Sequence, residues 1–102
     1  MPTSKTVRQL ALALPNAAER PSYGTPGFFV RKKLFVRILP DEDLAVFKID
    51  FDRRDVLMKS DPQAYFITDH YRNYPMMIVR LSSVDRSDLK ELIENAWQFA
   101  SE

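Results

Sequence analysis

The chain has a single histidine, and an acid lies beside it. His70 follows Asp69, and an imidazole with a neighbouring carboxylate is a common pair for general acid–base work or metal binding. Either role needs further ligands or a nucleophile, and adjacent side chains point apart along an extended segment. The sequence therefore favours a structural or surface role for His70 and predicts neither catalytic residues nor a metal site.

The sequence lacks the other common motifs of catalysis and cofactor binding. It has no cysteine, which excludes disulfides, thiolate ligands and a cysteine nucleophile. Its two glycines form neither common phosphate loop, and no HExxH motif occurs. Asp50, Asp52 and Asp55 suggest a cation site, but capping of a helix by Asp52 explains these acids more simply. We expect a non-enzymatic protein without a cofactor.

The segment from His70 to Pro75 alternates aromatic rings with a cation. Tyr71 and Tyr74 can stack on nucleobases, and Arg72 can contact a phosphate. Aromatic side chains that pack beside a tight turn produce the same sequence. The segment is thus a candidate binding patch, with packing as the alternative interpretation.

Basic residues gather near the N-terminus, although the net charge of the chain is only +1. Residues 1–40 hold seven cations and one acid, for a net charge of +6, and the remainder carries −5. The densest run is Arg31, Lys32 and Lys33, which can bind a phosphate backbone or form a solvated hairpin tip. Such asymmetry can create a basic patch. Folding can equally scatter these charges.

Hydrophobic spacing predicts the elements that position these residues. A first helix runs from residue 4 to Leu14 and ends at Pro15. A short helix capped by Asp52 extends to residue 59, and a closing helix begins at Asp85 or Ser87. Strands are expected at 28–30, 34–39, 44–49, 65–68 and 76–81. Residues 20–27 hold both glycines and are predicted as a turn-rich connection in which both can take positive φ.

This order of elements predicts an α+β fold in one domain, residues 1–102. We expect a mainly antiparallel sheet with the N-terminal, middle and C-terminal helices packed on one face. No apolar run approaches the length of about 18 residues needed to span a membrane, so no membrane association is expected.

Alternation of side chains divides three of the strands into an apolar face and a mixed face. Each mixed face carries one cation: Arg37, Lys48 or Arg80. Phe35 shares the mixed face with Arg37. These cations either keep the exposed side of the sheet soluble or converge on an open surface that binds phosphates and stackable rings.

Three stretches together resemble the MmcQ/YjbR family over essentially the whole chain. They are ALP at 13–15 followed by PSYGTP at 21–26, FVRKKLF at 29–35, and FITDHYRNYP at 66–75. The closing helix around Leu89–Trp97 completes the resemblance. Lys32 departs from it, because a glycine is expected there in many relatives, and this makes the hairpin tip more basic.

The resemblance implies a small bacterial cytoplasmic protein whose α+β fold is similar to a "double wing" DNA-binding domain. It implies no catalytic residues, and it makes residues 70–75 the most characteristic patch. The resulting hypothesis is a DNA-binding module with no metal, whose candidate phosphate contacts are Arg31, Lys32, Lys33, Arg37, Lys48, Arg72 and Arg80. The candidate stacking or ligand patch is Phe35, His70, Tyr71 and Tyr74. The alternative is an adaptor or small-ligand domain, which a deep apolar pocket beside His70 and Tyr71 would favour.

Overall fold

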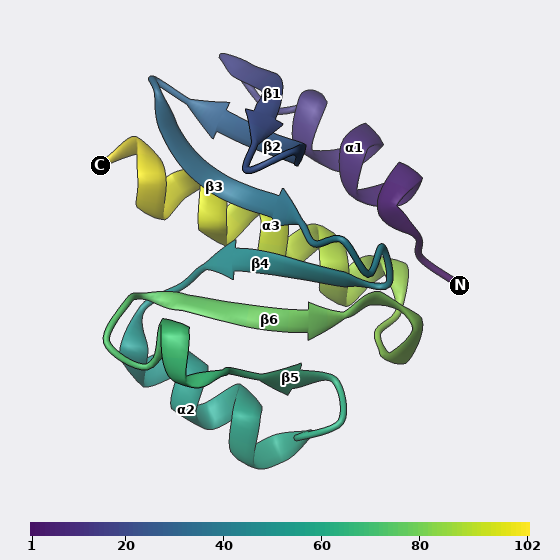
Figure 1. The fold of residues 1–102 in the computed structure, drawn as a ribbon, viewed down its shortest axis with the longest axis vertical. Helices are drawn as coiled ribbons and strands as arrows, with labels where there is room; N and C mark the ends of the chain where they lie inside the picture. Colours follow the sequence, from purple (N-terminus) through teal and green to yellow (C-terminus); the bar gives the residue numbers. More distant parts are fainter.

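Six antiparallel strands form one sheet, in the order β1-β2-β3-β4-β6-β5 (Figure 1). The computed structural model describes residues 1–102. The strands are β1 (Ala17–Ser22), β2 (Thr25–Val30), β3 (Lys33–Ile38), β4 (Leu44–Lys48), β5 (Tyr65–Phe66) and β6 (Met76–Arg80). The helices are α1 (Ser4–Leu12), α2 (Phe51–Ser60) and α3 (Arg86–Ser101), with short 3-10 turns η1 (Asp69–Tyr71) and η2 (Leu81–Ser83).

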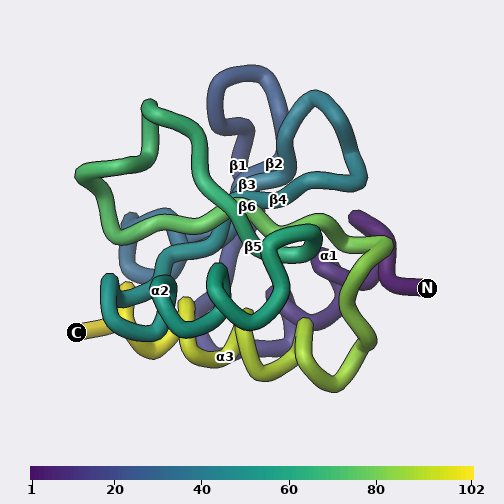
Figure 2. The backbone as a smooth tube through the Cα atoms, turned by 90° about the horizontal axis from the view of Figure 1, so that it is seen from below, coloured from purple at the N-terminus to yellow at the C-terminus, as the bar shows by residue number.

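The three α-helices lie on one side of the sheet, as Figure 2 shows with the sheet nearly edge-on. From the opposite side project the β1–β2 turn, the β3–β4 connection and the segment between β5 and β6. The predicted α+β fold with helices on one face is therefore confirmed. No helix combines the length and the apolar character needed to cross a membrane.

The core fills the layer between the sheet and the helices. Val36, Phe47 and Met77 occupy paired positions on β3, β4 and β6, and all three are buried. They belong to the same cluster as Leu89 and Ile93 of α3. The stripe predicted for the closing helix is thus its buried face, and Asp85 caps that helix by accepting a hydrogen bond from the backbone N–H of Asp88 at 2.8 Å.

The predicted connection at residues 20–27 is instead part of the β1–β2 hairpin. Its turn consists of Tyr23 and Gly24, whose φ angles of 53° and 83° suit the twist of a two-residue hairpin loop. Gly27 takes no positive φ, contrary to expectation. It is needed for space, because a Cβ there would lie 2.9 Å from the Cβ of Ser22.

A β-bulge in β3 corrects the predicted placement of Phe35. Phe28 pairs with Val36 and Phe29 with Leu34, so Phe35 is the extra residue of the bulge. Alternation is interrupted there, and Phe35 is fully buried in the helix-side core. Its expected role as a stacking group on the exposed face is therefore wrong.

Two helix boundaries also differ from prediction. The first helix ends at Leu12, with Ala13 as its C-cap, two residues before the expected end. The second helix is capped by Asp50, whose side chain accepts a hydrogen bond from the backbone N–H of Arg53 at 2.8 Å, and Asp52 lies within its first turn. The acids at 50–55 thus support a helix start, in agreement with the simpler interpretation.

Candidate binding face

The side of the sheet opposite the helices carries its own row of paired side chains. Arg37, Val46, Ile78 and Phe66 follow one another across β3, β4, β6 and β5. Val46 and Ile78 are buried yet lie outside the helix-side core cluster. We call this side the open face. Its centre is shielded by the loops that project over it, and the space between those loops is where a partner can approach.

A groove of about 340 Å³ lies on the open face. We call it the central groove, and its lining residues are Tyr23, Leu34, Arg37, Val46, His70, Tyr71 and Met76. The floor comes from β3, β4 and β6, whereas the walls come from the β1–β2 turn and from the segment between β5 and β6. Two segments nearly 50 positions apart in the sequence therefore face one another across the sheet.

Tyr23 forms one wall and is 93% exposed. The guanidinium carbon of Arg37 lies 5.3 Å from the centroid of its ring, a distance typical of a cation–π contact. Arg37 also donates a hydrogen bond from Nε to the backbone carbonyl of Ser22 at 3.0 Å. One arginine thus holds both the backbone and the ring of the turn, with its charge beside the groove.

His70 and Tyr71 form the opposite wall. Their rings meet edge-to-face with centroids 4.7 Å apart. The carboxylate of Asp69 pairs with the guanidinium of Arg72 and not with His70. Tyr74 lies outside the groove lining, with its ring 6.2 Å from His70. The structure therefore brings two of the predicted patch residues into the groove and leaves His70 without a carboxylate partner.

A buried arginine that the sequence analysis did not single out positions this wall. Arg54 of α2 donates hydrogen bonds from its guanidinium to the backbone carbonyls of Tyr71, Arg72, Tyr74 and Met76, at 2.9–3.2 Å. It is the one buried charged side chain of the chain. Because one rigid planar group binds four carbonyls, it fixes the course of the whole segment.

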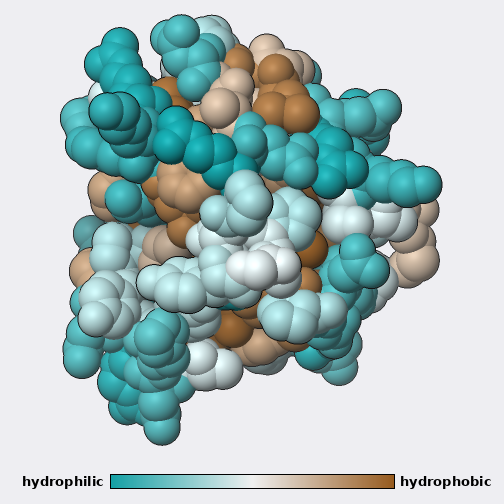
Figure 3. Space-filling model, turned by 45° about the horizontal axis from the view of Figure 1, so that its top comes forward, coloured by the Kyte–Doolittle hydropathy of each residue, from teal (hydrophilic) through white to brown (hydrophobic).

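Arginine–aromatic pairs recur across the open face. Arg20 lies 5.5 Å from the ring centroid of Phe29, and Arg80 lies 5.4 Å from that of Phe66, in addition to the pair formed by Arg37. Five cation–ring contacts of this kind occur in the chain, and these three lie on the open face, whereas Lys48 with Phe99 and Arg54 with Phe51 lie elsewhere. Figure 3 shows that hydrophobic surface on this part of the molecule is broken into small areas by hydrophilic and near-neutral residues.

The basic run at the β2–β3 turn lies apart from the groove lining. Arg31 and Lys32 are its two turn residues, both exposed, with positive φ angles of 51° and 70°. Lys33 begins β3 and donates a hydrogen bond from Nζ to the backbone carbonyl of Glu102 at 3.0 Å. This hairpin tip therefore lies near the C-terminus of α3, at one end of the sheet (Figure 1).

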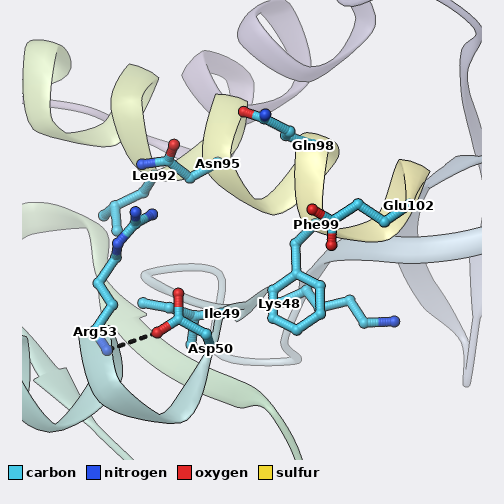
Figure 4. Close-up of a pocket in the computed structure, with 9 residues that line it drawn as sticks. All are labelled: Lys48, Ile49, Asp50, Arg53, Leu92, Asn95, Gln98, Phe99 and Glu102. Atoms are coloured by element: carbon cyan, nitrogen blue, oxygen red, sulfur yellow. Dashed lines mark hydrogen bonds between the residues drawn. The ribbon is translucent and has the colours of Figure 1, made fainter.

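Lys48 does not join Arg37 and Arg80 on the open face, which corrects the predicted convergence of three cations. It is the last residue of β4, so its long side chain can bend around the end of the sheet. The ammonium lies 5.9 Å from the ring centroid of Phe99 in α3. As Figure 4 shows, Lys48 lines a cleft between α2 and α3 instead.

That second cleft has a volume of about 320 Å³ and a mixed lining. Lys48 and Arg53 supply positive charge, whereas Asp50 and Glu102 supply negative charge. A lining with both signs selects for neither anions nor cations.

No group of three or more histidine, cysteine, aspartate or glutamate side chains in the chain is placed to hold a metal ion.

Groups with shifted pKa values lie on the helical side of the sheet or at a helix end. Burial, followed by the nearby carboxylates of Asp88 and others, raises the pKa of the Tyr65 hydroxyl. The hydrogen bond and charge of Glu19 raise the pKa of Arg8. A backbone hydrogen bond from Asp88 lowers the pKa of the Asp85 carboxyl. These shifts come from burial, from the ion pair between Arg8 and Glu19 and from helix capping.

Comparison with solved structures supports this class of fold, an antiparallel sheet covered by helices on one side only. The crystal structure of Deinococcus radiodurans protein DR2400, described as a DUF419 domain, superposes with a TM-score of 0.86. The superposition covers 100% of this chain and 80% of that chain, at 22% sequence identity. At this identity the similarity establishes the fold.

The model of the YjbR family matches residues 12–99, and the chain belongs to this family. Similar proteins include the uncharacterized protein Rv2570 of Mycobacterium tuberculosis (strain ATCC 25618 / H37Rv) and the uncharacterized protein Mb2600 of Mycobacterium bovis. Each is 44% identical over 41 residues, which is 40% of this chain and 32% of the relative. The match thus spans about a third of these curated relatives.

Proposed function

We propose that the chain is a DNA-binding module without catalytic activity, and that its open face is the binding surface. The observation that carries the proposal is the set of three arginine–aromatic pairs on that face, Arg20 with Phe29, Arg37 with Tyr23 and Arg80 with Phe66. Proteins that hold nucleic acids without a sequence code combine cations that contact phosphates with aromatic rings that stack on bases. The open face supplies both groups side by side.

The residues proposed to contact phosphates differ from those expected from the sequence. Arg37 and Arg80 remain, and Arg20 joins them. Arg31, Lys32 and Arg72 are exposed at the margins and can reach phosphates farther along a bound strand. Lys48 and Phe35 are omitted because the structure places them elsewhere, and Lys33 is omitted because its ammonium donates a hydrogen bond to Glu102 at the end of α3. We also propose that the protein is located in the bacterial cytoplasm and that its fold is similar to a double-wing DNA-binding domain.

A paired comparison of charge reversals tests the proposal. Arg20→Glu with Arg37→Glu should weaken binding of labelled single-stranded or duplex DNA at least tenfold in fluorescence anisotropy, because two phosphate contacts become repulsive. Lys5→Glu with Arg86→Glu reverses two exposed cations near the N-termini of α1 and α3, on the helical side, and should leave affinity within about threefold. Equal loss in both double variants would show that net charge alone attracts DNA and would exclude the open face.

The central groove also supports a second candidate function, an adaptor or small-ligand domain. Its floor residues Leu34, Val46 and Met76 are apolar, and Tyr71 and Tyr23 add aromatic surface. An apolar ligand or peptide side chain would bind there with little dependence on salt, because counterion release plays no part. DNA binding that is absent at low salt, together with salt-independent binding of an aromatic ligand, would favour this candidate.

A further inference from the structure

The volume of the central groove leaves room for one ring system of a small ligand. Its volume of about 340 Å³ lies at the lower end of the range of roughly 300–1,000 Å³ for small-molecule sites. A duplex cannot place a base in the groove, because every base in a duplex is stacked and paired. A base that has left its stack presents two apolar faces and a polar edge, and it can enter.

The walls of the groove offer rings to such a base from both sides. Tyr23 projects from the β1–β2 turn, whereas Tyr71 and His70 project from the segment between β5 and β6. Apolar side chains of Leu34, Val46 and Met76 close the floor. Stacking between a base and an aromatic ring tolerates any base, because every base has a π-face.

Charge around the groove complements a phosphodiester chain. Arg37 lies in the lining, with its guanidinium carbon 5.3 Å from the ring centroid of Tyr23. Arg20, on the same face, makes no ion pair and is exposed. The nearest acid of the opposite wall, Asp69, is already paired with Arg72. A strand whose base enters the groove therefore meets cations and no unpaired carboxylate at the walls.

Both walls are held in place before any ligand arrives. Arg54 binds three carbonyls of the segment that bears Tyr71 and the carbonyl of Met76 at the start of β6, and Arg37 binds the carbonyl of Ser22 beside Tyr23. A site that is ordered in advance loses little conformational entropy on binding. A groove with fixed walls favours ligands whose shape already fits between them.

We infer that the central groove is a pocket for one unpaired nucleobase, so that the protein prefers single-stranded nucleic acid to duplex. The inference rests on the proposed function and adds which form of nucleic acid is bound. Tyr23 and Tyr71 stack on the base, and Arg37 contacts the phosphate next to it. Phosphate contacts outside the groove serve single and double strands alike, so the preference arises in the groove itself.

Three labelled probes of equal length, about 12 nucleotides, separate base binding from phosphate binding. They are an oligothymidylate, a duplex, and an abasic strand that keeps the sugar-phosphate chain. We expect the oligothymidylate to bind at least fivefold more tightly than the abasic strand and the duplex in anisotropy titrations at about 50 mM salt. The stacked base accounts for the difference.

Two matched tyrosine variants locate the base. Tyr23→Asn removes the ring and keeps the turn, because Asn-Gly is the preferred pair at this type of turn. It should weaken oligothymidylate binding at least fivefold and leave abasic binding unchanged. Tyr74→Asn removes a ring that is 57% exposed and lies outside the groove, and it should change neither.

The outcomes distinguish this inference from the proposed function. Equal, salt-dependent binding of all three probes would leave a DNA-binding module in place and overturn the base pocket. The base pocket would also be overturned if Tyr74→Asn weakened oligothymidylate binding as much as Tyr23→Asn. Absence of binding to every probe at about 50 mM salt would overturn both the pocket and the DNA-binding function.

Discussion

Arg54 has no acidic partner although it is buried, and backbone carbonyls take the place of a carboxylate. Its Nε is the one buried side-chain nitrogen without a hydrogen-bond partner. The guanidinium also lies 4.8 Å from the ring centroid of Phe51 in the same helix. This single side chain joins α2 to the segment that forms one wall of the central groove, and it links the fold to the site.

Replacement of Arg54 by methionine tests this link. Arg54→Met keeps most of the side-chain volume but leaves four carbonyls without their donor, so the free energy of unfolding should fall by about 3 kcal/mol. Arg53→Met, at the exposed neighbouring position, should change it by less than about 0.5 kcal/mol. Urea denaturation measures both values. Similar stabilities for the two variants would show that the carbonyl contacts do not hold the segment.

Lys32 offers a second test at the residue scale. It has a φ of 70°, a conformation that costs a residue with a Cβ roughly 1–2 kcal/mol. Lys32→Gly should raise the free energy of unfolding by about 0.5–1 kcal/mol after the added entropy of the unfolded chain is subtracted. Lys32→Ala removes the same charge but keeps the Cβ, and it should bring no such gain. Equal effects of both variants would assign the change to charge.

Helix spacing explains why sequence analysis missed Arg54. In α2 the apolar residues form no continuous stripe, since Phe51 and Val56 are exposed while Leu57 and Met58 pack against the core. Without a stripe, the orientation of the helix about its axis cannot be predicted. Two adjacent arginines then look equivalent, although one is buried and the other exposed. Tyr23 was overlooked for a different reason, because residues 20–27 were predicted as a turn-rich connection and not as a hairpin with a defined two-residue turn.

Among the elements, β1 was the least predictable. Its sequence AAERPS holds no β-branched or large aromatic residue, and it forms an edge strand that pairs with β2 only. Its pairing with β2 runs through a two-residue turn, and Glu19 also forms an ion pair with Arg8 of the preceding helix α1. By contrast, α3 was predicted well because its apolar residues keep helical spacing over four turns and its cap is an aspartate.

Gly27 tests the packing of the β1–β2 hairpin. A Cβ at this position would lie 2.9 Å from the Cβ of Ser22 and 3.1 Å from Cδ1 of Leu34, so strand β2 must shift in Gly27→Ala. We expect a loss of roughly 1–3 kcal/mol in the free energy of unfolding, measured by thermal or urea denaturation. Gly24→Asn should be tolerated, because asparagine accepts positive φ and no atom lies within 4 Å of the added Cβ. Unchanged stability of Gly27→Ala would mean that the hairpin is loosely packed.

The cap of α3 gives a prediction for pH. Hydrogen bonds from the backbone N–H of Asp88 and from Ser87 lower the pKa of Asp85 below its ordinary value of 3.8. The folded state therefore gains stability from the ionised carboxylate above that pH, and it loses this gain as pH falls through the lowered pKa. Asp85→Asn should have a lower melting temperature than the wild type at neutral pH, with a difference that vanishes in acid. A difference that stays constant with pH would contradict the role of the charge.

On the scale of the whole molecule, the sheet separates the helix-side core from the candidate binding site. The helical side holds the core cluster, whereas the open side holds the arginine–aromatic pairs and the central groove. The basic N-terminal part of the chain is divided between them: Lys5 and Arg8 lie in α1, and Arg20 and Arg37 lie on the open face. Charge counted along the sequence was therefore a weak guide to the basic surface.

The candidate site was predictable in part, for physical reasons. Arg37 was placed on the exposed side correctly because Val36 and Arg37 follow the bulge and keep regular alternation. Phe35 was misplaced because a bulge depends on the partner strand and leaves no mark in its own sequence. Lys48 was misplaced because alternation describes the direction of Cβ and not the reach of a long side chain at the end of a strand.

A salt titration of DNA binding tests the central claim most directly. If phosphate contacts from the open face hold the strand, the logarithm of the association constant should fall linearly with the logarithm of salt concentration. Three or four contacts give a slope of about −2 to −3 for single-stranded DNA. The double variant Arg20→Glu with Arg37→Glu should flatten the slope by at least one unit, whereas Lys5→Glu with Arg86→Glu should keep it. No measurable binding at about 50 mM salt, or a slope near zero, would contradict the account.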